Sequence, residues 1–359
     1  MGSHNPIEES MACRLCFGAC RVMLTLTPTP IANSFPELPD KGAPTIPLEI
    51  QECISCGHVQ QKYRPSIDWV DYRYQTPAAN RAHLAKAADE LKFFYPKAQK
   101  VMEIGCNNGL YLDELRKVGF DAFGVDPNTT VGIAAPFSSA LAEDLGQVDI
   151  IVANNVLAHV DDLWDVFRGI DKMLGVDGVL VFEVQDFDAL CERGAFDMMY
   201  HEHRDYHTVE PLVPFLKRFG LEIERLEPLT THGGSKRYWC RRPYRWRALS
   251  EKIISGKRAL QEQIIDIDGT IACFGATAKA CTLIHHFGLV DLIDYCVDDT
   301  PQKQGRYIPG TNIPIYPTSY LTEVPPDAVV MTAWNFKTVL QEKYPQLHWI
   351  IPFEEALCR

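Results

Sequence analysis

At residues 101–109 the chain reads Val-Met-Glu-Ile-Gly-Cys-Asn-Asn-Gly, a short apolar strand that runs into a glycine turn. Residues 110–118 have a helical pattern, and residues 120–125 form the next apolar strand. A strand, a turn, a helix and a second strand in this order predict one unit of a parallel, doubly wound α/β sheet. Such sheets bind ligands at the carboxyl ends of their strands, so we expect a cofactor at residues 105–109.

Further apolar, β-branched runs along the chain suit more buried parallel strands. Helices are predicted over residues 80–94 and 163–174, with strands at 149–153 and 179–184. Two late strands, at 222–226 and 235–240, are expected to pair antiparallel at the edge of the sheet. A second α/β series has strands at 270–274, 292–297, 329–332 and 348–351 and a helix at 278–287. We therefore divide the chain into three regions, residues 1–70, 71–248 and 249–359.

The composition limits what the chain can bind. It has 359 residues and a formal net charge of −12, and it contains no long run of Lys or Arg. Binding to a polynucleotide depends on a basic surface, so no nucleic-acid partner is expected. No apolar run approaches the roughly 20 residues that span a bilayer, so we expect no membrane association and a cytoplasmic protein.

Four of the 12 cysteines form two pairs with the spacing of metal ligands. The pairs are Cys13-x-x-Cys16 and Cys53-x-x-Cys56. Four thiolates around a tetrahedral zinc ion make a closed, structural site, so residues 1–70 are expected to bind zinc, with Cys20 and His58 as substitute ligands. The alternatives are two unrelated reduced pairs or a redox pair, although a redox pair requires a strand-helix setting that neither has.

The glycine turn has an acidic residue on each side. Gly105 permits a tight turn, and Gly109 lets a ligand approach the following helix closely. Glu103 precedes the turn, and Asp126 ends the next strand, where its carboxylate can accept hydrogen bonds from both hydroxyls of a ribose. The alternative is a plain glycine turn with a solvated aspartate. The predicted cofactor-binding residues are Glu103, Gly105, Asn107, Gly109, Asp126, Asn154 and Asn155.

Residues 200–203 read Tyr-His-Glu-His, a density of ionisable side chains that a solvated surface does not explain. Histidine transfers protons readily near pH 7, and a neighbouring Glu or Tyr can orient it or relay a proton. We interpret the cluster as acid/base machinery, against the alternatives of a metal site or a polar helix cap. His159 follows the strand at 149–153 and suits a catalytic or a structural role equally. The predicted catalytic residues are His203, Tyr200, Glu202 and His159.

Together these motifs resemble the sugar C-methyltransferase family that acts on deoxysugar nucleotides. The glycine turn and its acidic neighbours resemble the first motifs of class I S-adenosylmethionine-dependent methyltransferases. The resemblance extends to Thr231-His-Gly-Gly-Ser235, Gly275-Ala-Thr-Ala-Lys279 and residues 299–310. It implies a zinc-binding domain over 1–70, a class I methyltransferase Rossmann-like sheet that binds S-adenosylmethionine over 71–248, and a C-terminal Rossmann-like domain over 249–359 that binds the substrate nucleotide.

The resemblance also implies the reaction. A base, preferably His203 acting directly or through Tyr200, removes a proton beside the ketone of a nucleotide-linked 4-keto-6-deoxy sugar. The resulting enolate, at C-3, then accepts the methyl group. The expected nucleotide is dTDP, with GDP and UDP as alternatives, and O- or N-methylation of the same class of sugar is the alternative reaction. The implied substrate-binding residues are Tyr72, Tyr74, His201, His232, Ser235, Lys279, Lys303 and Arg306.

The sequence departs from the family pattern just after the expected base. Residues 204–207 are Arg-Asp-Tyr-His, where aromatic residues are usual, and Lys236 stands where an apolar residue is usual. These departures leave the reaction class intact but leave the sugar and the nucleotide open.

Overall fold

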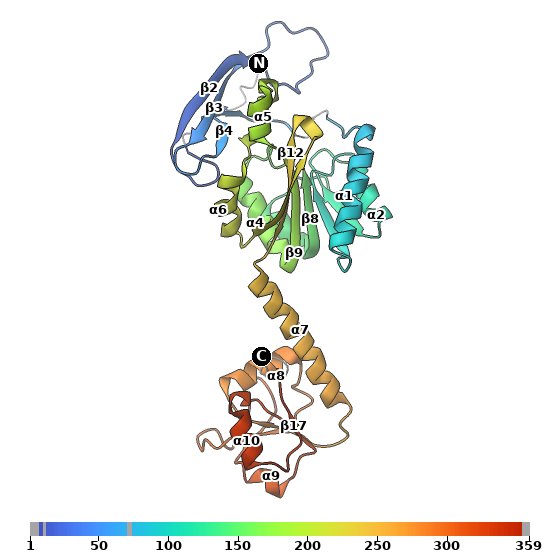
Figure 1. Ribbon diagram of the computed structural model, residues 1–359, viewed down its shortest axis with the longest axis vertical. Coiled ribbons are helices and arrows are strands. Elements are labelled where there is room, and N and C mark those ends of the chain that lie inside the picture. The colour runs from blue at the N-terminus through green and yellow to red at the C-terminus, as the bar shows by residue number, and fades with distance from the viewer. Residues whose placement is uncertain (1–6, 10–11, 70–73, 354–359) are drawn as a thin grey trace. The chain divides into compact units, whose positions relative to one another are not determined.

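The computed structural model describes residues 7–9, 12–69 and 74–353 of the chain. They belong to two compact units, Met1–Arg247 and Ala248–Arg359 (Figure 1). Each unit has its own hydrophobic core. Tyr72, which we predicted to line the sugar pocket, lies outside the described residues. Within the described part of the chain, no helix combines the length and the apolar character needed to cross a lipid bilayer.

The first unit is built on a six-stranded sheet with the order β11-β12-β9-β8-β6-β7. Its parallel strands are β6 (Lys100–Ile104), β7 (Asp121–Val125), β8 (Val148–Asn154) and β9 (Leu174–Gln185). β12 (Ser235–Arg241) runs antiparallel to β9 and to the edge strand β11 (Glu222–Leu229). The predicted parallel strands and the antiparallel pair at the sheet edge are therefore confirmed.

Helices cover both faces of this sheet, as Figure 1 shows. α1 (Arg81–Phe94) and α2 (Leu110–Lys117) pack on one face, and α4 (Leu163–Met173) and α6 (Val209–Arg218) pack on the other. Successive residues of a strand point to opposite faces, so Val101 joins the core under α1 and Met102 joins the core under α4. Burial on both faces explains why these strands are continuous apolar runs.

Shorter helices connect these elements. They are α3 (Ser139–Leu145), α5 (Phe187–Arg193) and the 3-10 turns at Ala78–Asn80, Phe196–Met198 and Thr231–Gly233. The helices predicted over 80–94, 110–118 and 163–174 agree with α1, α2 and α4 to within one residue at each end.

The N-terminal region forms an antiparallel head sheet, which we define as β2 (Cys20–Thr29), β3 (Ile46–Cys53), β4 (Val59–Gln61) and β10 (Asp205–Tyr206). β1 (Ile7–Glu9) pairs separately with β5 (Tyr63–Pro65). None of these strands was predicted, although Ile46, Leu48 and Ile50 alternate with Pro47 and Glu49 and could have indicated β3. The strand β10 comes from far along the chain, and its residues pair with Gln60 and Val59 of β4.

The second unit contains a five-stranded parallel sheet with the order β15-β14-β13-β16-β17. The strands are β13 (Ile271–Phe274), β14 (Tyr295–Val297), β15 (Ile315–Tyr316), β16 (Ala328–Val330) and β17 (Trp349–Ile350). The helices are α8 (Ala278–Phe287), α9 (Tyr320–Glu323), α10 (Lys337–Lys343) and α7 (Tyr244–Ile265), of which residues 244–247 belong to the first unit, with a 3-10 turn at Trp334–Phe336. This order, with β13 in the centre, is that of a Rossmann-like sheet, as expected.

Candidate active site and metal centre

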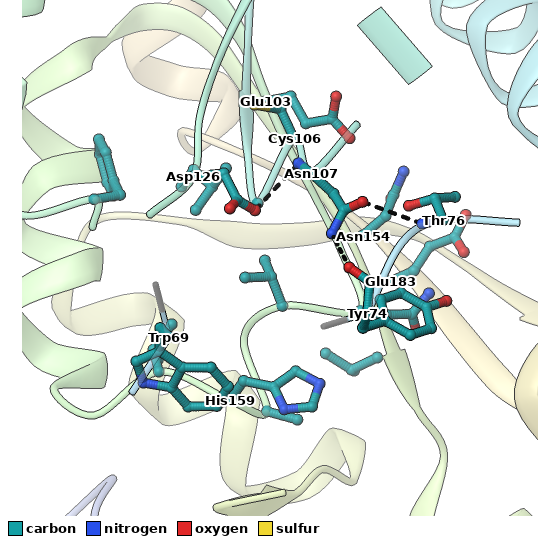
Figure 2. Close-up of a pocket in the computed structure, with 18 of the residues that line it drawn as sticks. Trp69, Tyr74, Thr76, Glu103, Cys106, Asn107, Asp126, Asn154, His159 and Glu183 are labelled. Atoms are coloured by element: carbon teal, nitrogen blue, oxygen red, sulfur yellow. Dashed lines mark hydrogen bonds between the residues drawn. The ribbon is translucent and has the colours of Figure 1, made fainter. Parts of the chain in front are cut away.

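A cavity of about 390 Å³ lies at the carboxyl ends of the parallel strands of the first unit (Figure 2). It brings together residues that the sequence analysis assigned to two different tasks. From the cofactor set it is lined by Glu103, Gly105, Asn107, Asp126, Asn154 and Asn155. From the catalytic and substrate sets it is lined by His159, Tyr200, His203, Tyr74 and His232. One cavity can therefore hold a cofactor and the group on which it acts.

The glycine turn is tightly enclosed. Gly105 has a φ of +77°, and a Cβ placed there would lie 2.8 Å from Cγ2 of Val156. Gly109 has the same φ, and a Cβ there would lie 2.7 Å from Cγ2 of Val131. Both positions therefore need glycine for backbone conformation and for space.

The part of the cavity beside the glycine turn is acidic. Glu103 is buried, and its Oε2 has no hydrogen-bond partner among the described residues. Burial, reinforced by the nearby Asp126 carboxylate, raises the pKa of Glu103 well above its ordinary value. None of the described residues that line the cavity is Lys or Arg. An unpaired buried carboxyl and an anionic wall fit a ligand that carries positive charge, as the sulfonium and ammonium groups of S-adenosylmethionine do.

Asn107 holds the wall of the cavity together. Its Nδ2 donates to the carbonyl oxygen of Tyr74 at 2.8 Å, and its Oδ1 accepts from the backbone N–H of Thr76 at 3.1 Å (Figure 2). Its own backbone N–H donates to Oδ2 of Asp126 at 3.1 Å. The Asn107 side chain is thus committed to the segment that carries Tyr74, and its backbone orients the predicted ribose-binding carboxylate.

Tyr200 and His203, which both line the cavity, form a hydrogen-bonded pair. Nδ1 of His203 lies 2.9 Å from the carbonyl oxygen of Met198, so it must carry the proton and donate. Nε2 is then an acceptor, and the Tyr200 hydroxyl, 2.7 Å away, donates to it. Burial, together with the nearby His159, lowers the pKa of His203 well below its ordinary value. The imidazole is therefore neutral at pH 7 and oriented to take a proton from Tyr200.

His159 lies beside this pair, with its ring centroid 4.8 Å from that of His203. Its Nδ1 donates to the carbonyl oxygen of Glu202 at 2.9 Å, which fixes Nε2 as the acceptor nitrogen. Burial lowers the pKa of His159 below its ordinary value. A neutral His159 in this tautomer can accept a proton but cannot donate one to an oxyanion.

The other two members of the 200–203 motif face the head sheet and do not line the cavity. Nε2 of His201 lies 3.3 Å from the carbonyl oxygen of Pro47, and its Nδ1 lies 3.5 Å from Oγ1 of Thr29. Oε1 of Glu202 accepts from the backbone N–H of Asn33 at 2.8 Å. These two side chains attach residues 200–203 to β2, β3 and the loop between them.

The remaining predicted substrate residues are dispersed. Ser235 begins β12 outside the cavity lining, and its hydroxyl donates to the carbonyl oxygen of Thr231 at 3.1 Å. Lys279, Lys303 and Arg306 belong to the second unit. Nζ of Lys303 lies 2.9 Å from Oδ2 of Asp298, and Lys279 donates to Asn335.

His83 and Glu183 line the cavity, and Arg237 contacts Glu183 from behind; the sequence analysis missed all three. Nε2 of His83 lies 3.0 Å from both carboxylate oxygens of Glu183, and both residues line the cavity. Nε of Arg237 donates to Oε1 of Glu183 at 2.8 Å. Burial alone would raise the pKa of Glu183, but the hydrogen bond from His83 and the charge of Arg237 hold it below its ordinary value. The place of Glu183 at the end of a predicted strand was the one signal that could have indicated it.

The four paired cysteines converge in the head sheet. Their Sγ atoms all lie within 4.8 Å of one another, with 3.6 Å between Cys13 and Cys56 and 3.4 Å between Cys16 and Cys53. Four sulfurs at zinc bonds of about 2.3 Å would lie about 3.8 Å apart, so the cluster fits that ion. The suggested substitute ligand His58 instead hydrogen-bonds to Asp205 through Nε2 at 2.9 Å.

Two family models match neighbouring parts of the chain. A family model described as a methyltransferase domain matches residues 72–226, and one described as a C-methyltransferase C-terminal domain matches residues 236–350. The chain is similar to the C-methyltransferase NovU of Streptomyces niveus, with 26% identity over 383 residues, covering 92% of this chain and 90% of that protein.

Two other similarities are partial. The ubiquinone biosynthesis O-methyltransferase of Azorhizobium caulinodans is 28% identical over 100 residues, covering 24% of this chain and 40% of that protein. The magnesium protoporphyrin IX methyltransferase of Synechocystis PCC 6803, solved with bound SAH, superposes with a TM-score of 0.37 and 14% identity, covering 47% of this chain and 90% of that one. At this TM-score the superposition adds nothing to what the strand order already establishes.

Proposed function

We propose that this chain, an S-adenosylmethionine-dependent methyltransferase with a C-methyltransferase C-terminal domain, methylates C-3 of a nucleotide-linked 4-keto-6-deoxy sugar. The observation that carries the proposal is the pairing of Tyr200 with His203 inside the cavity that also holds the glycine turn. Methylation of the carbon beside a ketone requires a base that removes the proton from that carbon. Methyl transfer to a hydroxyl or an amine, by contrast, requires no ketone in the sugar. The similarity to the C-methyltransferase NovU over 92% of the chain supports the same reaction class.

In the proposed mechanism the proton leaves the sugar through Tyr200. Nε2 of His203 takes the phenolic proton as the Tyr200 oxygen takes the C–H proton, and the carbonyl of Met198 holds the histidine in the required tautomer. His159, with Nε2 as an acceptor, is the second candidate base. His232, an implied substrate-binding residue that lines the cavity, is the proposed hydrogen-bond donor to the enolate oxygen.

Two further groups complete the proposal. S-adenosylmethionine, when bound, supplies an electrophilic methyl group, and Asp126 and Glu103 would hold its ribose and its cationic part. The four clustered cysteines would hold a structural zinc ion, since four protein ligands leave no open position for chemistry. Lys279, Lys303 and Arg306 would contact the diphosphate of a nucleotide, with dTDP as the first choice and GDP or UDP as alternatives.

The test is exchange of the ring proton in deuterated buffer without methyl donor. A panel of dTDP-, GDP- and UDP-linked 4-keto-6-deoxy sugars is incubated with the enzyme, and deuterium at C-3 is measured by mass spectrometry and NMR. We expect one sugar to exchange, and His203→Ala to slow the exchange by about 10²- to 10⁴-fold. His286→Ala, an exposed histidine of α8, is the matched control and should exchange at the wild-type rate. Methylation without exchange at carbon, or an O- or N-methylated product, would overturn the proposal.

A further inference from the structure

Asp205 follows the proposed catalytic pair by two residues and is tied to the metal centre. Its side chain is fully buried. Nε of Arg14 donates to its Oδ1 at 2.9 Å and to its Oδ2 at 3.0 Å, and Nε2 of His58 lies 2.9 Å from its Oδ1. Arg14 stands between the two cysteines of the first pair, and His58 stands two residues after Cys56. Both partners of Asp205 are therefore set by the loops that hold the cysteines.

Arg14 also reaches the loop that carries His159. Its Nη1 donates to the carbonyl oxygen of Asp161 at 3.0 Å, and its Nη2 donates to that of Val160 at 2.6 Å. One buried guanidinium thus holds β10 on one side and the segment after His159 on the other. Arg donors lie in a fixed plane, so these contacts constrain distance and orientation together.

The two catalytic segments are joined again beside this contact. The backbone N–H of Arg204 donates to the carbonyl oxygen of Ala158 at 2.7 Å, and Nδ1 of His159 donates to that of Glu202 at 2.9 Å. Misplacement of either segment would therefore move both His159 and His203. Misplacement by about 1 Å is enough to lower a rate by about 10²-fold.

We infer that Asp205 is a positioning residue for the methyl transfer, and that Arg14 and His58 couple it to the metal centre. The cysteine loops, closed around their metal, fix Arg14 and His58. These in turn fix Asp205 and, through it, the segments that carry Tyr200, His203 and His159. The inference rests on the proposed function for its catalytic residues. The inference goes beyond the proposed function because it assigns the metal centre a role in positioning the catalytic residues.

The first test uses the wild-type chain and needs no substrate, so it stands apart from the identity of the sugar. Zinc is removed with a chelator, its loss is measured by elemental analysis, and amide hydrogen exchange is followed by mass spectrometry. We expect peptides covering residues 156–162 and 198–207 to lose protection together with the cysteine loops. The glycine turn at 105–109 should keep its protection. Protection retained at 198–207 after zinc has left, or lost throughout the chain, would overturn the inference.

The second test is Asp205→Asn, which keeps the shape of the side chain and removes its charge. We expect an unchanged zinc content and an unchanged Kd for S-adenosylmethionine, but a kcat lower by about 10- to 100-fold. Arg14→Lys keeps the charge but lacks the planar set of donors. It should likewise lower kcat without changing the zinc content or the Kd, and it replaces the first variant if that variant does not fold. The matched control is Glu49→Gln, which removes the carboxylate paired with Lys62 in the head sheet. A wild-type kcat in either folded variant would overturn the inference.

Discussion

At the scale of single residues, one glycine and one histidine show how the fold restricts residue type and stability. Gly105 combines a positive φ with a neighbour, Val156, that leaves no room for a Cβ. His207 is buried, and neither of its ring nitrogens has a hydrogen-bond partner among the described residues. The first restricts the cofactor turn to one residue type, while the second is a destabilising feature that the fold tolerates.

Comparison of Gly105→Ala with Gly119→Ala separates the effect of backbone strain from the effect of a steric clash. We expect Gly105→Ala to weaken binding of S-adenosylmethionine by at least about tenfold, because the new Cβ displaces Val156 from the cavity wall, and to destabilise the fold by about 1–3 kcal/mol. Calorimetric titration and chemical denaturation measure the two effects. The control is Gly119→Ala, whose φ is +88° with nothing within 4 Å of the added Cβ. It should lose stability alone, and equal loss of affinity in both variants would contradict the argument.

His207 predicts how stability depends on pH. Burial lowers the pKa of His207 to about 4, whereas the unfolded chain has a value of about 6.5. Between pH 6.5 and 4 only the unfolded state takes up the proton. The free energy of unfolding therefore has its full value above pH 6.5 and decreases as the pH falls towards 4. We expect His207→Phe to be more stable than wild type, with the difference growing by about 2 kcal/mol between pH 7 and pH 5.

Chemical denaturation of both chains at the two pH values tests this expectation. His285→Phe, at an exposed position in the second unit, should follow the wild-type pH dependence. Parallel pH curves for wild type and His207→Phe would show that His207 does not titrate as described.

At the scale of elements, the contact between α1, β9 and β12 has no counterpart in the sequence patterns. Glu183 from β9 binds His83 from α1 and Arg237 from β12, and Arg237 also contacts Glu90 at 2.8 Å. The residues of this network are far apart in sequence, so no local periodicity indicates the network.

The helix α7, by contrast, could have been predicted, because Leu249, Ile253, Leu260 and Ile264 have helical spacing.

Glu183→Gln tests this network. Loss of the carboxylate removes one of three carboxylates around the buried Arg237 guanidinium, since Glu90 and Glu227 stay at 2.8 and 3.3 Å. Leaving a buried polar group short of one partner costs about 1–3 kcal/mol. Glu224→Gln, which removes an exposed partner of Arg247, is the control and should cost no more than about 1 kcal/mol. Denaturant midpoints measure both. Similar losses would mean that Glu183 acts as an ordinary surface charge.

At the scale of the whole molecule, sequence patterns predicted the parts that are continuous along the chain. The buried parallel strands are visible as apolar runs, and the glycine turn with Glu103 and Asp126 lies within neighbouring elements. The last strand of the head sheet could not be predicted, because β10 has two residues and is too short to have a period. The contact between Arg14 and Asp205 spans 191 positions, a distance at which single-sequence patterns carry no information. The candidate site was therefore recognised by its motifs but not by the contacts that position them.

The origin of β10 bears on how the protein is made. A ribosome delivers both cysteine pairs long before residues 205–206 emerge, and until then β4 has one edge without a partner. Unpaired strand edges are sites of aggregation, and contacts between distant segments form slowly. The head sheet is thus expected to stay incomplete during synthesis until residues 205–206 emerge. Its last strand arrives only when the residues proposed to perform the chemistry have been translated.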